Sequence, residues 1–206
     1  MFPNNQLVLH NVRAPVRLSV NGQLKTDDAF YKFCVANPDL RLERSPEGDV
    51  IVMPPAGGES DYRCVDASTQ LRLWSKKNGR GKAFGSSVEF FLPSGAAYSP
   101  DAAWVSNKQL SRFTKEQLRK FLPLSPEFVI EVMSPSDRLK AAQKKMQAWI
   151  AEGVDLAWLI DADHKTLYIY RAGATQPEKR TGITKVAGEG PVKGFVLNLK
   201  DIWAGL

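Results

Sequence analysis

Three acidic residues lie in segments that are otherwise predicted to be strands of a folded core. Glu131 interrupts the apolar run 128–133, and Asp101 opens a strand that continues with Ala, Ala, Trp and Val. Glu43 lies in a predicted hairpin, one residue past Leu42. Carboxylates are rarely buried unless they are paired or bound to a cation, and acids on separate strands can converge at one end of a sheet. The pattern therefore predicts a Mg²⁺ site, because Mg²⁺ takes oxygen ligands, keeps several waters and can assist the attack of water on a phosphodiester.

Each of these acids also has an ordinary structural interpretation. Glu131 could pair with an arginine in the interior or reach solvent at the strand end. Asp101 belongs to a Pro-Asp pair, which is also a turn signal. Glu43 lies on an edge hairpin, which exposes alternate residues.

A candidate cation lies on the helix that follows the strand of Glu131. On a 3.6-residue wheel this helix has an apolar stripe, formed by Leu139, Ala142, Met146, Trp149 and Ile150. Lys144 falls nearly opposite the stripe and is expected in solvent. Lys145 lies about 90° from the stripe centre, so its stem can cover the core while its ammonium group reaches a nearby site. Gln143 borders the other side. Ordinary snorkelling without function is the alternative for Lys145.

The elements that must position these residues indicate one α/β domain with a mixed sheet over 26–206. Residues 1–25 are polar and are expected to form a tail or an added strand. Helices are predicted over 26–37, 60–77, 136–152 and, as a short helix, near 114–117. Strands are predicted over 40–43, 50–53, 84–92, 99–105, 127–133, 156–160, 167–170 and 195–199. Two details are specific: Val65, Leu71 and Trp74 should face inward, and Ser136-Asp137 should cap the helix that carries Lys145.

Composition narrows the class of protein. The 206 residues are 43% hydrophobic and 24% charged, which is an ordinary globular balance. No apolar run approaches the ~20 residues of a membrane helix. Cys34 and Cys64 make no metal-binding spacing, and His10 and His164 leave little for a zinc site. His164 lies in a predicted hairpin turn and Cys34 on an apolar helix face, so both are expected to be structural. With no secretory signal in view, the cytoplasm is the expected compartment.

Charge is distributed unevenly along the chain. The formal net charge is +6, yet residues 27–61 hold eight acids and three bases. The bases cluster elsewhere, at Arg72, Lys76, Lys77, Arg80 and Lys82 and again at Arg138, Lys140, Lys144 and Lys145. A basic surface beside a group of acids suits a polyanionic substrate and a divalent cation. A solvated basic surface with no partner is the alternative.

Several of these segments together resemble the Uma-two family, whose members are described as restriction endonucleases of the PD-(D/E)XK nuclease superfamily. The matching segments, in order, are 42–54, Ser99-Pro100-Asp101, 126–137, Lys145-Met146 before Gly153-Val154, and Trp158-Leu159-Ile160-Asp161 before Tyr170-Arg171. The resemblance covers about residues 26–200.

The resemblance implies a restriction-endonuclease-like fold, in which a mixed β-sheet is flanked by helices. It implies a Mg²⁺-dependent endonuclease acting on DNA, with Mn²⁺ as a substitute, and a homodimer. Asp101 and Glu131 would be metal ligands, with Glu43 as an additional acid. The superfamily's usual lysine position is Met133 here, and the lysine would be relocated to Lys145, with Gln143 at a polar position of the same helix.

Other functions remain open at this point. Met133 in the usual lysine position favours a catalytically degenerate protein that binds nucleic acid, or a dimeric interaction domain. Two carboxylates could also be the acid and base of a glycoside hydrolase. That class commonly needs aromatic residues in an open cleft, whereas Trp74, Trp104, Trp149 and Trp158 are all at positions predicted to be core.

Overall fold

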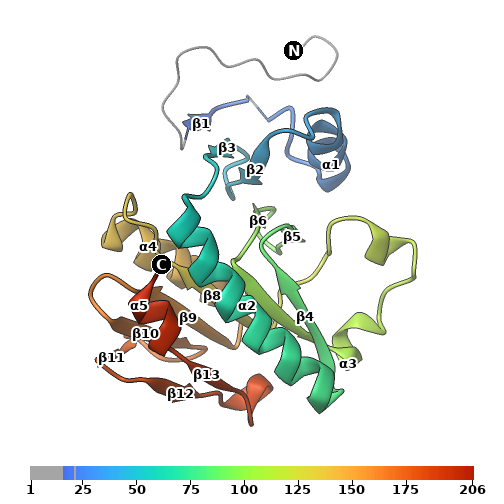
Figure 1. The fold of residues 1–206 in the computed structure, drawn as a ribbon. Coiled ribbons are helices and arrows are strands. Elements are labelled where there is room, and N and C mark those ends of the chain that lie inside the picture. The colour runs from blue at the N-terminus through green and yellow to red at the C-terminus, as the bar shows by residue number, and fades with distance from the viewer. Residues whose placement is uncertain (1–15, 21) are drawn as a thin grey trace. The chain divides into compact units, whose positions relative to one another are not determined.

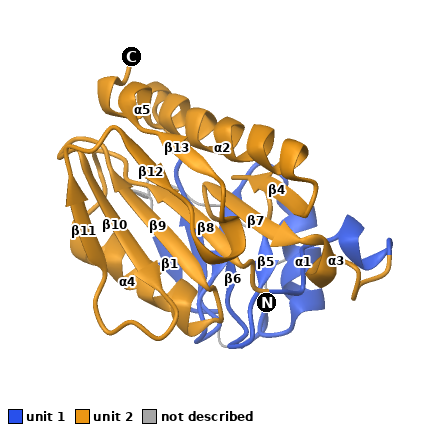
Figure 2. Cartoon of the chain, turned by 90° about the horizontal axis from the view of Figure 1, so that it is seen from below, with its two compact units in different colours: residues 1–55, 89–99, 115–124 blue, residues 56–88, 100–114, 125–206 orange. Residues whose placement is uncertain are grey.

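The computed structural model describes residues 16–20 and 22–206, and these residues form two compact units (Figures 1 and 2). Unit 1 comprises the chain up to Pro55 together with 89–99 and 115–124, and unit 2 comprises 56–88, 100–114 and 125–206. His10 and most of the predicted N-terminal segment lie outside the described residues. The single domain predicted over 26–206 stays a prediction.

In the described residues, unit 1 is a five-stranded antiparallel sheet with one α-helix and one 3₁₀ turn. Its strands are β1 (Val16–Leu18), β2 (Arg41–Arg44), β3 (Val50–Met53), β5 (Phe90–Phe91) and β6 (Ala97–Tyr98), in the order β1-β3-β2-β6-β5. The helices are α1 (Asp27–Ala36) and a 3₁₀ turn, η2 (Gln117–Arg119). Thr26 caps α1 as the sequence predicts, because its Oγ1 accepts a hydrogen bond from the N–H of Ala29 at 3.2 Å. The predicted hairpin is β2–β3.

Arg44 is the buried charge at the centre of unit 1, and its side chain is 0% exposed. Its Nε donates to the carbonyl of Gly95 at 2.7 Å and its Nη1 to the carbonyl of Leu24 at 3.0 Å. Its Nη2 donates to Asp27, whose side chain is half exposed. The guanidinium carbon also lies 5.1 Å from the ring centre of Phe30, a cation–π contact. Arg44 therefore links the sheet, α1 and two loops of unit 1.

Replacing Arg44 with alanine is expected to destabilise the protein by about 2–4 kcal/mol, because two buried carbonyls lose their donors and a large cavity opens. The loss of stability is expected to be smaller than for a fully buried ion pair, because the half-exposed Asp27 can be solvated once Arg44 is removed. Urea unfolding followed by circular dichroism measures the change. Val35→Ala, at an exposed position of α1, is the control and should change stability by less than about 0.5 kcal/mol.

Cys34 is held as a neutral thiol in unit 1. Burial raises its pKa from 9.0 to about 12, with a further increase from the charge of Glu89 and an opposing effect of Arg44. The folded state holds this proton more tightly than the unfolded chain. The stabilisation is therefore complete below pH 9 and is lost as the pH rises from about 9 toward 12.

In a Cys64→Ser variant Cys34 is the one remaining cysteine, so its reactivity reports the raised pKa of its thiol. At pH 8 we expect its thiol to react with an alkylating reagent about 10³-fold more slowly in the folded protein than in urea, because only the thiolate reacts. Equal rates in the two states would show that the thiol is not shielded. Mass spectrometry of the labelled protein gives both rates.

Unit 2 contains a six-stranded mixed sheet, as the sequence predicts for the fold. Its strands are β4 (Gly81–Gly85), β7 (Ala102–Ser106), β8 (Phe128–Val132), β9 (Leu156–Asp161), β10 (Thr166–Arg171) and β11 (Glu178–Thr181), in the order β11-β10-β9-β8-β7-β4. Only the pair β8–β9 is parallel. A second sheet pairs β12 (Lys185–Ala187) with β13 (Val196–Asn198). The helices are α2 (Gly58–Asn78), α3 (Asn107–Leu110), α4 (Leu139–Ala151), α5 (Lys200–Ala204) and the 3₁₀ turn η3 (Gly190–Val192).

Helices cover both faces of the six-stranded sheet. Figure 2 shows α2 and α5 over one face and α4 on the other. Ala67 and Leu71 of α2 are buried in one cluster with Ile130 and Trp158 of the sheet, whereas Met146 and Trp149 are the buried residues of α4. Within the described residues, none of the helices is long and apolar enough to cross a membrane. The predicted class, a mixed sheet flanked by helices, is confirmed.

Four local predictions are wrong. The strand predicted over 84–92 is broken, because Gly85 and the two serines after it form a turn; β4 ends there and β5 begins at Phe90. Val65 is 52% exposed rather than inward, since it lies on the opposite side of the helix from Trp74. The short helix predicted near 114–117 is the 3₁₀ turn η2. The helix α4 starts at Leu139 with Arg138 as its N-cap, later than the predicted Ser136-Asp137 cap.

Candidate active site

Two of the predicted acids meet at one edge of the unit 2 sheet. Strands β7 and β8 are antiparallel with Ala102 opposite Ile130, so one step outward along this register places Asp101 opposite Glu131 on the same face of the sheet. Asp101 Oδ2 accepts a hydrogen bond from the N–H of Val132 at 2.8 Å, which holds its carboxylate against the end of β8. Residues directly opposite in such a pair have neighbouring side chains. The prediction that acids from separate strands converge therefore has a structural basis for this pair.

The cation predicted from the helical wheel reaches Glu131. The Nζ of Lys145 lies 3.0 Å from Glu131 Oε1. Trp149, one turn further along α4, donates from its indole N–H to the same oxygen at 2.8 Å. The Glu131 and Lys145 side chains are 13% and 27% exposed, so the pair lies in a half-buried environment where its attraction is stronger than in water. Lys144 is exposed, as predicted.

Cys64 of α2 is an additional member of this group. Burial raises the pKa of its thiol, and the nearby charge of Asp101, a hydrogen bond to that carboxylate and the charge of Glu131 raise it further. The thiol is therefore neutral at pH 7. It contributes a weak hydrogen-bond donor beside Asp101 and leaves the local charge unchanged. This role could not be predicted from the sequence, because nothing in the spacing of Cys64 relates it to Asp101.

The side chains at this edge fit a hard divalent cation. Two carboxylates and one ammonium group leave a net charge of −1, and carboxylate oxygen is the donor that Mg²⁺ and Mn²⁺ prefer. No cluster of three or more His, Cys, Asp or Glu side chains suited to hold a metal occurs in 16–20 and 22–206. The pair therefore matches the sparse type of site, in which one or two carboxylates hold Mg²⁺ and water completes its shell. A closed site of four protein ligands, as for structural zinc, does not fit.

Glu43 lies in unit 1, whereas Asp101 and Glu131 belong to unit 2. Glu43 is on β2 and is 5% exposed, and its Oε1 accepts a hydrogen bond from the N–H of Ser99 at 3.2 Å. The hydroxyl of Ser99 donates to Glu89, a second buried carboxylate, at 2.6 Å. The predicted role of Glu43 as an additional acid near the metal stays a prediction.

The two secondary candidates occupy ordinary positions next to the site. Met133 follows β8, is half-buried, and donates its backbone N–H to the carbonyl of Ile160 at 2.8 Å. Gln143 lies half-buried on α4, two residues before Lys145. Their predicted roles are not tested by these positions.

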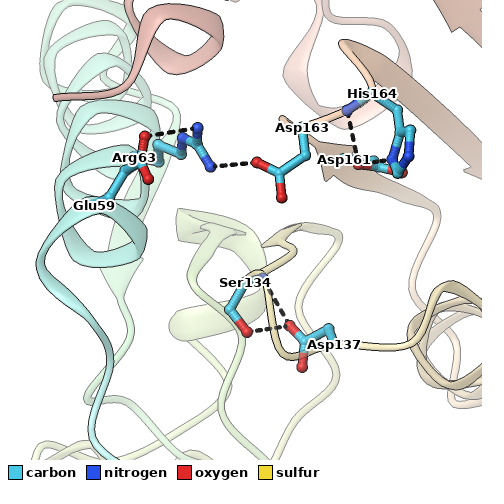
Figure 3. Close-up of polar contacts among 7 residues, drawn as sticks. All are labelled: Glu59, Arg63, Ser134, Asp137, Asp161, Asp163 and His164. Carbon is cyan, nitrogen blue, oxygen red and sulfur yellow. Dashed lines mark hydrogen bonds and ion pairs between the residues drawn. The ribbon is translucent and has the colours of Figure 1, made fainter.

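Further polar contacts lie at the same edge of the sheet, where the parallel strands β8 and β9 both end (Figure 3). After β8, Asp137 accepts hydrogen bonds from the N–H and the hydroxyl of Ser134 at 2.8 and 2.9 Å. At the end of β9, buried Asp161 accepts from the N–H of His164 and lies 2.9 Å from its Nδ1. The His164 side chain is 79% exposed, and its place in the β9–β10 turn agrees with the structural role predicted for it.

Arg63 ties α2 to the β9–β10 turn. Its Nη1 donates to Asp163 at 3.1 Å and its Nη2 to Glu59 at 3.0 Å (Figure 3). The Arg63 side chain is 6% exposed, whereas both acids are about half exposed. Because Cys64 is the next residue of α2, this contact fixes the part of α2 that faces Asp101. It was not predicted from the sequence, since Arg63 and Asp163 are a hundred residues apart.

Replacing Arg63 with alanine is expected to destabilise the protein by about 2 kcal/mol, because a buried charged hydrogen-bonding group is lost. Arg72→Ala, at an exposed position of the same helix, should cost less than about 0.5 kcal/mol. Thermal unfolding of both variants measures the difference. Equal losses would show that the Arg63 contacts contribute nothing specific.

A cavity of about 690 Å³ lies at the opposite edge of the same sheet. Trp104, Ser106, Glu127 and Arg171 are among its lining residues, and Asp101 and Glu131 are not. Glu127 is occupied there as the acceptor for the N–H and hydroxyl of Ser106. The candidate active site is therefore separate from this cavity.

Comparison with known proteins gives the class of the chain. The family model of Uma2, described as "Putative restriction endonuclease", matches residues 27–199. The chain therefore belongs to the Uma2 family, the family to which the sequence motifs point. No curated protein matches it.

A structure from Anabaena variabilis is among the solved structures that are similar to this fold. It is titled "Crystal structure of a putative nuclease belonging to DUF820 from Anabaena variabilis ATCC 29413", and it superposes with a TM-score of 0.65. The match covers 79% of this chain and 89% of that chain at 20% sequence identity. At this identity the likeness establishes the shared fold.

Proposed function

We propose that this chain is a metal-dependent endonuclease that hydrolyses phosphodiester bonds in DNA. The observation that carries the proposal is the meeting of Asp101 and Glu131 at one sheet edge, with Lys145 at 3.0 Å from Glu131. Membership in a family described as restriction endonucleases supports the coarser class, a nuclease.

In this proposal each residue has a distinct role. Asp101 and Glu131 hold Mg²⁺, or Mn²⁺ in its place, and the N–H of Val132 orients Asp101. When bound there, the metal would supply Lewis acidity toward water and the phosphate. Lys145 orients the attacking water or stabilises the negative charge that develops on the phosphate. Trp149 and Lys145 together fix the Glu131 carboxylate, and Glu43 is proposed as the additional acid.

A nucleic-acid substrate is favoured by charge. The chain carries a net charge of +6, and Arg138, Lys140 and Lys144 are exposed at the start of α4, next to Lys145 in the sequence. Basic side chains in such a position can contact phosphates on either side of the cleaved bond without distinguishing one DNA sequence from another. Binding is then expected to weaken steeply with salt.

A cleavage assay tests the proposal. Supercoiled plasmid, single-stranded DNA and RNA are incubated with the protein in Mg²⁺, in Mn²⁺ and in EDTA. We expect DNA cleavage that requires the metal and is lost in Asp101→Asn. Cleavage that continues in EDTA, or at the wild-type rate in Asp101→Asn, would contradict it.

One observation favours a second candidate, a degenerate nuclease that only binds nucleic acid. Met133 stands two residues after Glu131, the position where the superfamily pattern has a lysine. For this candidate the same samples should show salt-sensitive DNA binding with no dependence on metal and no cleavage.

A further inference from the structure

The outer face of α2 carries an exposed stripe that the proposed active site does not use. Tyr62, Val65 and Leu73 are 40%, 52% and 64% exposed. Thr69 and Lys76 are also exposed and complete the stripe on one side of the helix. The opposite side of α2 is the buried one, where Ala67 and Leu71 join the core. These exposed side chains therefore lie outside the packed core of unit 2.

The spacing of this stripe is the same in both directions along the helix. Its five members follow one another at intervals of three, four, four and three residues, with Thr69 at the centre. Two copies of α2 that pack antiparallel about a two-fold axis at Thr69 therefore bring unlike members to the same level. Val65 of one copy meets Leu73 of the other, and Tyr62 meets Lys76, which is a suitable pair for a cation–π contact.

The charges that flank the stripe follow the same symmetry. The first half of α2 carries Asp61 and Asp66, and the one arginine of that half, Arg63, is buried and paired. The second half carries bases and no acids: Arg72 and Lys77 lie beside the stripe, and Lys76 lies within it. An antiparallel pair places the acidic half of one helix against the basic half of the other. A parallel pair would place like charges together, which is unfavourable.

We infer that two copies of this chain associate through the outer face of α2, antiparallel and centred on Thr69. From Tyr62 to Leu73 the stripe spans about 16 Å at ~1.5 Å per residue, so the contact is small compared with stable dimers, which bury roughly 1,200–2,000 Å². The dimer is therefore weak and dissociates on dilution. The stripe faces away from Cys64, so pairing leaves the proposed active site uncovered.

Sedimentation across a range of protein concentrations tests the inference. The wild type should shift from monomer to dimer as concentration rises. Leu73→Asp should raise the dissociation constant at least about tenfold, since it puts a carboxylate into the apolar seam next to Val65 of the partner copy. Leu73 is exposed, so this variant should fold, and circular dichroism confirms that. Val196→Asp changes an exposed valine on β13 and should leave the dimer intact.

Charge exchange gives the sharper test because the interface is isologous. In the proposed pair, Lys76 of each copy lies near Asp61 of the other. Lys76→Glu and Asp61→Lys should each weaken self-association. An equimolar mixture of the two variants should recover it as a mixed dimer, in which both contacts are again between opposite charges.

Four results would overturn the inference. The wild type could remain monomeric at all concentrations, both single variants could associate as the wild type does, or the mixture could stay monomeric. A Lys76→Glu variant that keeps its oligomeric state but loses DNA affinity would also overturn it, and would assign this face of α2 to nucleic acid.

Discussion

Replacing Glu131 with glutamine is expected to abolish metal-dependent cleavage while the protein stays folded. The amide keeps the shape of the side chain and can still accept from the indole of Trp149, but it loses the charge that holds a cation and pairs with Lys145. Loss of a metal that supplies several kcal/mol of transition-state stabilisation lowers the rate by on the order of 10³. Cleavage of plasmid DNA in Mg²⁺, measured beside circular dichroism of the variant, checks both parts.

Glu127→Gln is the matched control for this experiment. Glu127 precedes the same strand at its other end, where its carboxylate accepts hydrogen bonds from Ser106, and it is absent from the candidate site. We expect a small loss of stability and a cleavage rate within about twofold of the wild type. If Glu131→Gln cleaves as fast as Glu127→Gln, Glu131 has no role in catalysis.

Replacing Lys145 with alanine should separate catalysis from metal binding. Lys145 is proposed to act on the water or the phosphate, so the cleavage rate should fall by about 10²–10⁴-fold. Metal affinity should be no weaker than in the wild type, because the substitution removes a positive charge 3.0 Å from a proposed ligand oxygen. Rates from oligonucleotide cleavage and affinities from calorimetry give the two numbers independently.

The neighbouring lysine provides the control for Lys145. Lys144 lies on the exposed side of α4, so Lys144→Ala should keep the catalytic rate and at most weaken DNA binding. Lys145→Arg, which keeps the charge, should restore part of the rate. A Lys145→Ala variant that loses metal binding and cleavage together would show instead that Lys145 only supports the structure around Glu131.

The pair of Asp101 and Glu131 could be predicted because Glu131 lies within an otherwise apolar strand and Asp101 directly precedes another. Their strands are short and regular, and the antiparallel register then aligns the two residues. Lys145 could be predicted from its place at the border of the helical stripe. Trp149 also had a signal, since residues four apart share a helix face. It was assigned to the core, where it is indeed buried, but its indole N–H reaches Glu131 as well.

Other features depend on contacts between residues that are distant in the sequence, and these could not be predicted. Arg44 is buried because Gly95 and Leu24 supply carbonyl acceptors, and neither is near it in the sequence. Cys64 faces Asp101 only because α2 packs across the end of β7. The break after Gly85 assigns the two halves of one predicted strand to different sheets. Local patterns carry none of this information.

Calorimetric titration with Mn²⁺ is the most direct test of the proposed metal site. Mn²⁺ favours the same oxygen ligands as Mg²⁺ and binds such sites more tightly, so it is the more sensitive probe. We expect the wild type and Lys144→Ala to bind the ion, and Asp101→Asn and Glu131→Gln both to lose it. Undiminished binding in both carboxylate variants, or no binding by the wild type even with a DNA oligonucleotide present, would contradict the proposed metal-dependent mechanism.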